Sequence, residues 1–262
     1  MAFAEVNGQR IAYHDSGGDG PAVVLAHGFL MDRTMFLHQV EALTPQYRVI
    51  TWDERGFGET EWDGRPFTYW DSAADCIGLL DHLGIERAVV GGMSQGGFLS
   101  LRAALTNPDR VRALILLDTG AGIDDEATLA GYRALVDAWT TTGPTDELAG
   151  TVATIIINDT EENPRWIAKW QASRHELLAE PAECLFGRED ITHRLGEITC
   201  PALVVHGSAD TAIAPDRAGE MAAGLPAAGD IVIVDGAAHA ANLTHPEPVN
   251  EAILAFLDSL PD

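Results

Sequence analysis

The sequence predicts an α/β fold: a doubly wound, mostly parallel sheet of about eight strands with one helical insertion. Short, largely apolar runs such as 22–26, 111–117 and 202–205 alternate with amphipathic helical stretches. Runs of this kind are typical of parallel strands that helices cover on both faces. The alternation stops once, because no comparable run occurs between about residues 120 and 195.

The first half of the chain alternates strand and helix signals in a regular order. Asn7-Gly8 is the dipeptide most typical of a tight hairpin. The expected elements are, in order, a hairpin at 6–13, a strand at 22–26, a helix with Asp32 as its N-cap, a strand at 47–52 and a helix at 69–83.

The same alternation continues on both sides of the insertion. A strand that ends near Gly92 leads into a helix that Asn107-Pro108 stops. The remaining expected elements are strands at 111–117, 201–207 and 231–234, a helix at 215–223 and a final helix at 246–260.

We therefore predict two structural units, a core formed by residues 1–119 and 196–262 and a helical cap formed by residues 120–195. Helical stretches in the cap are separated by prolines, as at Gly143-Pro144 and Asn163-Pro164. Most aromatic residues of such a cap pack it onto the core. Some must face the gap between the cap and the core, and we expect contacts with substrate from Trp139, Trp166 and Trp170.

Composition excludes several classes of protein. The 262 residues carry 40 acidic and 16 basic side chains, and the formal net charge of −24 argues against binding to nucleic acid or to anionic membranes. Three widely spaced cysteines indicate neither a disulfide framework nor a metal site. With no apparent signal peptide or transmembrane stretch, we expect a cytoplasmic protein without metal or cofactor. The oligomeric state stays open.

The segment Gly92-Met93-Ser94-Gln95-Gly96 contains a G-x-S-x-G pattern between an expected strand and an expected helix. This pattern indicates a nucleophile elbow, a sharp turn that exposes the serine hydroxyl at the positive end of a helix. Ser94 is therefore the candidate nucleophile.

A nucleophilic serine needs a base and an acid that orients the base. The carboxyl ends of strands in a doubly wound sheet meet at one edge, and three of them supply Ser94, Asp210 and His239. Their order along the chain, Ser, Asp, His, is the order of an α/β-hydrolase triad. Asp118 also follows a strand, and whether it can replace Asp210 stays open.

The choice of His239 rests on elimination among nine histidines. His27 and His206 precede glycines at strand ends, where we expect them to hydrogen-bond loop backbone. His245 competes more strongly. Thr244 is placed to cap the final helix, however, and His245 would then be occupied in the first turn of that helix.

An oxyanion hole needs two backbone N–H donors. We expect one from Gln95, directly after the nucleophile, and the other from Phe29, in the loop after the 22–26 strand. Asp53 and Arg55 lie in a glycine-rich loop and are expected to form a structural ion pair with each other.

Together these motifs resemble the α/β-hydrolase superfamily, over nearly the whole chain outside the cap. The motifs are His27-Gly28, Asp53-x-Arg55-Gly56-x-Gly58, the Ser94 elbow and the segment 236–243. Segments 236–243 and 246–250 look most like the 3-oxoadipate enol-lactonase and small carboxylesterase branch. The resemblance implies a triad of Ser94, Asp210 and His239. Met93 and Gln95 depart from relatives that often carry His and Met around the serine.

The sequence thus predicts a cofactor-free serine hydrolase that cleaves a carboxylic ester or lactone through an acyl-enzyme on Ser94. Cap tryptophans and leucines favour a largely apolar small-molecule substrate. A carboxylate-bearing lactone would instead need a basic partner, and the cap offers Arg133, Arg165, Lys169, Arg174 and Arg188. The alternatives are a C–C bond hydrolase, a thioesterase or a perhydrolase-like enzyme with the same triad, or a ligand-binding receptor with little turnover.

Overall fold

The computed structural model describes residues 1–261, which form one eight-stranded sheet in the order β1-β2-β4-β3-β5-β6-β7-β8. Strands β1, β2 and β4 pair antiparallel, and the remaining pairs are parallel. The strands are β1 Ala2–Val6, β2 Gln9–Asp15, β3 Ala22–Ala26, β4 Arg48–Trp52, β5 Ala88–Met93, β6 Val111–Leu117, β7 Ala202–Gly207 and β8 Val232–Val234. The predicted mostly parallel sheet is confirmed.

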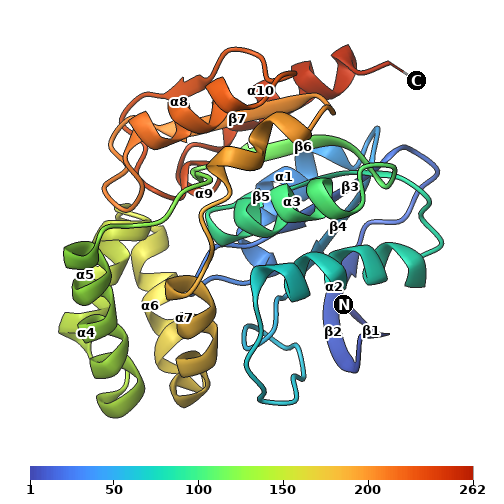
Figure 1. Ribbon diagram of the computed structural model, residues 1–262. Coiled ribbons are helices and arrows are strands. Elements are labelled where there is room, and N and C mark those ends of the chain that lie inside the picture. Colours follow the sequence, from blue (N-terminus) through green and yellow to red (C-terminus); the bar gives the residue numbers. More distant parts are fainter. Residues whose placement is uncertain (262) are drawn as a thin grey trace.

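Helices cover both faces of this sheet (Figure 1). Residues of α2, α3 and α8 belong to the hydrophobic core on one face, and residues of α1 and α10 belong to the core on the other. The core helices are α1 Leu37–Leu43, α2 Tyr69–His82, α3 Gln95–Thr106, α8 Pro215–Gly224, α9 Ala241–Thr244 and α10 Pro246–Ser259, with 3₁₀ turns η1 Arg33–Phe36 and η3 Thr192–Glu197.

The central strands are apolar along their whole length because each of their faces meets helices. In β6, Leu114 and Leu116 pack into the core beneath α2 and α3, and Ile115 and Leu117 pack into the core beneath α1 and α10. All four side chains are at most 1% exposed. Burial on both faces removes apolar surface from water and gives the unbroken apolar runs in the sequence.

Local sequence signals explain where several elements begin. The β1–β2 hairpin turns at Asn7 and Gly8, both of which have positive φ, as a type I′ turn requires. Asp32 accepts from the backbone N–H of Thr34 and caps η1, as expected. The expected cap at Thr244 is wrong. Thr244 ends helix α9, and His245 precedes α10 without a side-chain hydrogen bond to that helix.

The segment between β6 and β7 is helical in the part of the chain that the structure describes. It contains α4 Glu126–Thr142, α5 Asp146–Ile156, α6 Glu162–Gln171, the 3₁₀ turn η2 His175–Leu178 and α7 Ala179–Phe186. Figure 1 shows these helices gathered at one side of the sheet, and we call them the insertion. Within residues 1–261, no helix is both long and apolar enough to cross a membrane.

Candidate active site

Three strand ends supply the residues that the sequence singles out. Ser94 follows β5, Asp210 follows β7 and His239 follows β8. Strands β5, β6, β7 and β8 are parallel neighbours in the sheet, so the segments after them leave it at the same edge. Ser94 and His239 line one cavity, which we call the Ser94 cavity.

Ser94 occupies a strained turn between β5 and α3. Its φ is 53° and its ψ is −113°, a conformation that L-residues other than glycine rarely adopt. The glycines on either side allow the turn to close, because a Cβ at Gly92 or at Gly96 would collide with the carbonyl oxygen of Ala26 in β3. The turn leaves Ser94 directly before the first residue of α3, where the helix dipole favours negative charge.

His239 and Asp210 are directly joined. The Nδ1 atom of His239 lies 2.7 Å from Oδ2 of Asp210, and both side chains are at most 7% exposed. The carboxylate accepts a hydrogen bond from Nδ1–H, which keeps the proton of the neutral imidazole on Nδ1 and leaves Nε2 as the basic nitrogen. Burial works to raise the pKa of Asp210, but the charge of His239 and hydrogen bonds from His206 and His239 hold it well below its usual range. Asp210 is therefore ionised at neutral pH.

Asp118 has a different place in the same network. Its Oδ1 accepts from the backbone N–H of Gly207 at 2.8 Å and its Oδ2 from that of Ala241 at 3.2 Å, so it joins the β6, β7 and His239 segments. Burial raises the pKa of Asp118 to about 7. The two carboxyls thus differ in charge, and Asp210 is the ionised partner of His239.

His206 is a third member of this network and contacts the same carboxylate oxygen of Asp210 as His239 does. Its Nε2 lies 2.8 Å from the carbonyl oxygen of Ile213 and 3.1 Å from Oδ2 of Asp210. The contact with Ile213 confirms that His206 bonds loop backbone. Asp118, His206 and Asp210 also place ligand atoms within 4.8 Å of one another, but hydrogen bonds within the chain already engage all three side chains.

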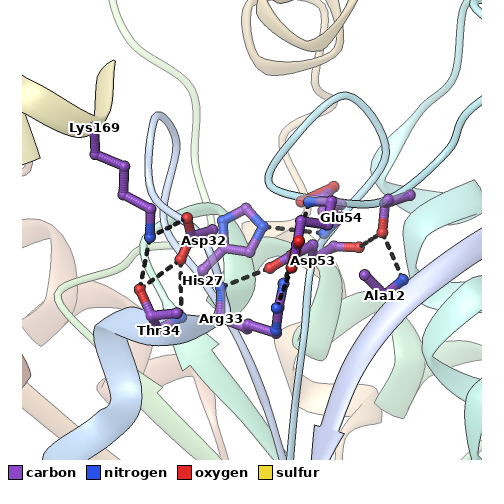
Figure 2. Close-up of polar contacts among 10 residues, drawn as sticks. Ala12, His27, Asp32, Arg33, Thr34, Asp53, Glu54 and Lys169 are labelled. Carbon is purple, nitrogen blue, oxygen red and sulfur yellow. Dashed lines mark hydrogen bonds and ion pairs between the residues drawn. The ribbon is translucent and has the colours of Figure 1, made fainter. Parts of the chain in front are cut away.

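His27 also bonds loop backbone, as expected. Its Nδ1 donates to the carbonyl oxygen of Gly28 at 2.8 Å. Its Nε2 accepts from the backbone N–H of Glu54 at 3.0 Å, as Figure 2 shows. Burial lowers the pKa of His27, which agrees with a neutral ring in this tautomer. His27 therefore fixes the loop after β3 to the loop after β4.

The expected ion pair between Asp53 and Arg55 is wrong. Arg33 pairs with Asp53 (Figure 2), and Arg55 pairs with Asp75 of α2, with Nε 2.5 Å from Oδ2. Arg55 lies in the turn that follows β4, and each of the two side chains pairs with a partner outside the loop. The loop is fixed to η1 on one side and to α2 on the other.

The Ser94 cavity has a volume of about 110 Å³ and a mostly apolar wall. Besides Ser94, the ionisable side chains that line the cavity are those of His239, Asp124, Arg188 and Tyr132. The insertion supplies much of the apolar wall, with Tyr132, Leu135, Val136, Val152, Ile155, Ile156, Leu185 and Phe186. Of the five basic side chains that the cap offers, Arg188 is the one that lines this cavity, where it lies 2.7 Å from Asp124.

The expectation that Trp139, Trp166 and Trp170 line the substrate site is wrong for the Ser94 cavity. They line a second cavity of about 410 Å³ on the other side of Leu30, and we call it the second cavity. Each tryptophan is at most 3% exposed. Trp170 stacks edge-on against Trp139 at 5.7 Å between ring centroids, so these side chains mainly pack the insertion together.

One expected oxyanion donor lies in the wall of the Ser94 cavity, and the other lies next to Ser94 in the chain. Phe29 lines the Ser94 cavity, and Gln95 is the first residue of α3, directly after Ser94. Within residues 1–261, neither backbone N–H donates to a protein acceptor. The side chain of Gln95 turns away and accepts from the Tyr69 hydroxyl at 3.2 Å.

Asp124 and Arg188 are functional candidates that the sequence does not single out together. They lie 64 residues apart and meet at the two ends of the insertion, where Arg217 also pairs with Asp124. Arg188 is among the five basic cap residues that the sequence offers, but no sequence signal points to Asp124 as its partner. Side-chain pairing across such a distance is not readable from spacing.

Comparison with known proteins assigns the fold to a family. A model of the family described as alpha/beta hydrolase fold matches residues 21–246. The chain therefore belongs to the α/β-hydrolase family, and the predicted resemblance is confirmed.

Solved structures and sequence relatives agree with this assignment. A thermophilic esterase from Thermogutta terrifontis is similar at a TM-score of 0.88 and 31% identity, over 96% of this chain and 94% of that one. The enol-lactonase from Burkholderia xenovorans LB400 is similar at 0.88 and 28%, over 98% and 100%. BpoC of Mycobacterium tuberculosis, named as a candidate non-heme bromoperoxidase, is 32% identical over 96% of this chain and 98% of its own. The chain also matches 12% of the length of polyketide synthase ThaQ of Burkholderia thailandensis, at 32% identity.

Proposed function

We propose that this α/β hydrolase cleaves carboxylic esters or lactones through an acyl-enzyme on Ser94. The observation that carries the proposal is the 2.7 Å contact between His239 and Asp210 beside a cavity that His239 shares with Ser94. An esterase and an enol-lactonase among the structural neighbours support the same chemistry.

In this mechanism Ser94 Oγ attacks the carbonyl carbon of the substrate while His239 Nε2 accepts the hydroxyl proton. Asp210 keeps the Nδ1 proton in place and stabilises the imidazolium that forms. His239 then returns the proton to the leaving alkoxide, and the acyl group stays on Ser94. A water molecule that His239 deprotonates attacks the acyl-enzyme, which releases the acid and regenerates the serine.

The oxyanion of each tetrahedral intermediate would bind the backbone N–H groups of Phe29 and Gln95. Both donors are free of protein acceptors among residues 1–261, as an oxyanion hole requires. The N-terminus of α3 adds a favourable dipole at the same place.

We infer that residues 120–195 act as a cap that selects the substrate. Most apolar side chains in the wall of the Ser94 cavity come from α4, α5 and α7, which favours a small, largely apolar acyl or lactone group. Asp124 and Arg188 add one ion pair to this wall, where a polar group of the substrate could be oriented.

Perhydrolysis is a second candidate, favoured by the similarity to BpoC. It needs the same acyl-enzyme, with hydrogen peroxide in place of water as the second nucleophile. Attack of the peroxide releases a peracid and leaves the serine free. Supplying peroxide with an ester substrate and measuring peracid against acid separates the two activities.

The direct test is hydrolysis of a small aryl ester by the wild type, Ser94→Ala and Ser100→Ala. Loss of the nucleophile should lower kcat by several orders of magnitude, on the order of 10⁶-fold in well-studied serine hydrolases. Ser100 is a matched control, because it is buried in the same helix α3 and its hydroxyl donates to the Gly96 carbonyl. Equal activity of Ser94→Ala and the wild type would refute the proposal.

A further inference from the structure

The loop that carries Phe29 has an unfavourable backbone conformation. The backbone N–H of Met31 donates to the carbonyl oxygen of Gly28 at 3.0 Å, which makes a turn with Phe29 and Leu30 at its centre. Leu30 has a φ of 65°, at a turn position that favours glycine or asparagine. A leucine keeps such a conformation only where other contacts hold it.

Helix α6 of the insertion supplies contacts of this kind. The indole Nε1 of Trp170 donates to the carbonyl oxygen of Leu30 at 2.7 Å. From the preceding position, Lys169 Nζ lies 2.5 Å from Asp32 Oδ2 and donates to Thr34 Oγ1 at 2.8 Å (Figure 2). One helix therefore holds the loop at its turn and again at the start of η1.

The ion pair with Lys169 is electrostatically favourable. Burial works to raise the pKa of Asp32, but the Lys169 ammonium and the hydrogen bonds from Thr34 outweigh burial and lower it. Lys169 is also the only lysine of the chain. Helix α6 thus gives the loop one ammonium and one indole N–H.

The turn lies between two cavities. Leu30 lines both the Ser94 cavity and the second cavity, and its half-buried side chain also packs against the core on the α1 and α10 face of the sheet. Trp170 itself is rigidly placed, because its ring contacts Trp139 and Trp166 with centroids 5.7 and 6.5 Å away. A fixed donor that faces a strained turn helps to set the conformation of that turn.

We propose that Trp170 and Lys169 are positioning residues that hold the turn in the conformation that aims the Phe29 N–H at the oxyanion. The proposal rests on the proposed function, since it presumes that Phe29 is an oxyanion donor. The insertion then controls the stabilisation of the transition state as well as the shape of the substrate site. Small displacements of an oxyanion donor are costly, because its hydrogen bond must form where charge develops.

Trp170→Phe and Trp166→Phe form a matched pair of variants. Both residues are buried tryptophans of α6, but only the Trp170 N–H binds the loop, and Trp166 Nε1 has no partner within residues 1–261. We expect Trp170→Phe to lower kcat for an aryl ester about tenfold, less than the 10²–10³-fold loss of a whole oxyanion donor. The KM of Trp170→Phe should stay within about twofold, and Trp166→Phe should match the wild type.

Affinity for an aryl boronic acid gives a second measurement, which a change in the packing of the cap alone would not alter. The tetrahedral adduct of the boronic acid with Ser94 places an oxygen in the oxyanion hole, so Trp170→Phe should weaken its binding by about the same factor as kcat. A general disturbance of the cap would instead raise KM and affect both tryptophan variants. Equal effects of Trp170→Phe and Trp166→Phe would overturn the proposal.

One further variant keeps the test decisive if Trp170→Phe folds poorly, and a double variant tests the role of Leu30. Lys169→Met removes the ammonium from a side chain that is 40% exposed, and it should lower kcat in the same sense. In a Leu30→Gly background the turn carries no strain, so the loss caused by Trp170→Phe should shrink. An undiminished loss would contradict the role of Leu30. A wild type that neither hydrolyses esters nor binds the boronic acid would refute the proposed function itself, whereas an active wild type with an unaffected Trp170→Phe would refute only this inference.

Discussion

Asp210 Oδ2 lies 2.7 Å from His239 Nδ1 and 3.1 Å from His206 Nε2, so one carboxylate oxygen joins two buried histidines. Its other oxygen accepts from the backbone N–H groups of Ala212 and Ile213 at 2.8 and 2.9 Å. Every bond favours the ionised carboxylate. In the proposed mechanism this network makes Asp210, and not Asp118, the acid that orients His239.

Replacing the two acids separately tests this assignment. Asp210→Asn should lower kcat by about 10⁴-fold, because the amide favours the wrong tautomer of His239. Asp118→Asn should lower kcat far less, since the raised pKa of about 7 means that Asp118 already holds a proton part of the time at neutral pH. Its cost should appear mainly in stability, through the bonds to Gly207 and Ala241. Equal losses of kcat, measured on one aryl ester, would contradict the assignment.

The sequence predicts the sheet, the elbow and the His239–Asp210 partnership because each depends on a repeating or directional rule. Apolar runs locate buried strands, and the strand order brings their ends to one edge. The sequence does not predict the place of Trp139, Trp166 and Trp170. An aromatic residue on an amphipathic helix has the same sequence spacing whether its side chain faces the core or a cavity. Contacts such as Lys169 with Asp32, 137 residues away, depend on how the insertion docks.

A single methyl group added at an elbow glycine should strongly lower the free energy of unfolding. In Gly96→Ala the new Cβ would collide with the Ala26 backbone, which cannot move without displacing β3. We expect a loss of unfolding free energy of about 3 kcal/mol or more. Gly150→Ala is the control, because that glycine lies inside helix α5 with nothing within 4 Å of the new Cβ, and alanine favours helix. Urea unfolding of both variants measures the difference, and similar stabilities would argue against the close β3–elbow contact.

Glu54 predicts how stability changes with pH. Burial raises its pKa from the ordinary value of 4.5 to about 8, so the folded state binds the proton more tightly than the unfolded chain. As pH rises from about 4.5 to about 8, the unfolded chain ionises first and the free energy of unfolding falls, by up to about 1.4 kcal/mol per pH unit. The loss is complete above the folded pKa.

Glu54→Gln does not titrate and should therefore flatten this decline, which urea unfolding at pH 5, 6.5 and 8 would show. The exposed Glu86 provides the matched control, since Glu86→Gln should keep the wild-type slope. Asp118, whose pKa is also raised, should leave a residual decline in Glu54→Gln. An unchanged slope in Glu54→Gln would show that this carboxyl is ionised in the folded protein.

The cavity wall predicts substrate size. Leu135→Ala enlarges the Ser94 cavity and should raise the ratio of kcat/KM for long-chain over short-chain aryl esters by about tenfold, the effect of roughly one methylene group. Leu177→Ala removes a comparable half-buried leucine of the insertion that lines the second cavity instead. Its chain-length profile should match the wild type. The same shift in both variants would mean that the Ser94 cavity does not hold the acyl group.

Covalent labelling of the wild type with a fluorophosphonate tests the central claim most directly. The reagent reacts with a serine only where a base activates the hydroxyl and donors stabilise the phosphoryl oxygen. Intact mass spectrometry followed by peptide mapping should find one adduct, on Ser94, that is absent from Ser94→Ala and strongly slowed in Asp210→Asn. An unlabelled wild type, or an adduct on a different residue, would contradict the account.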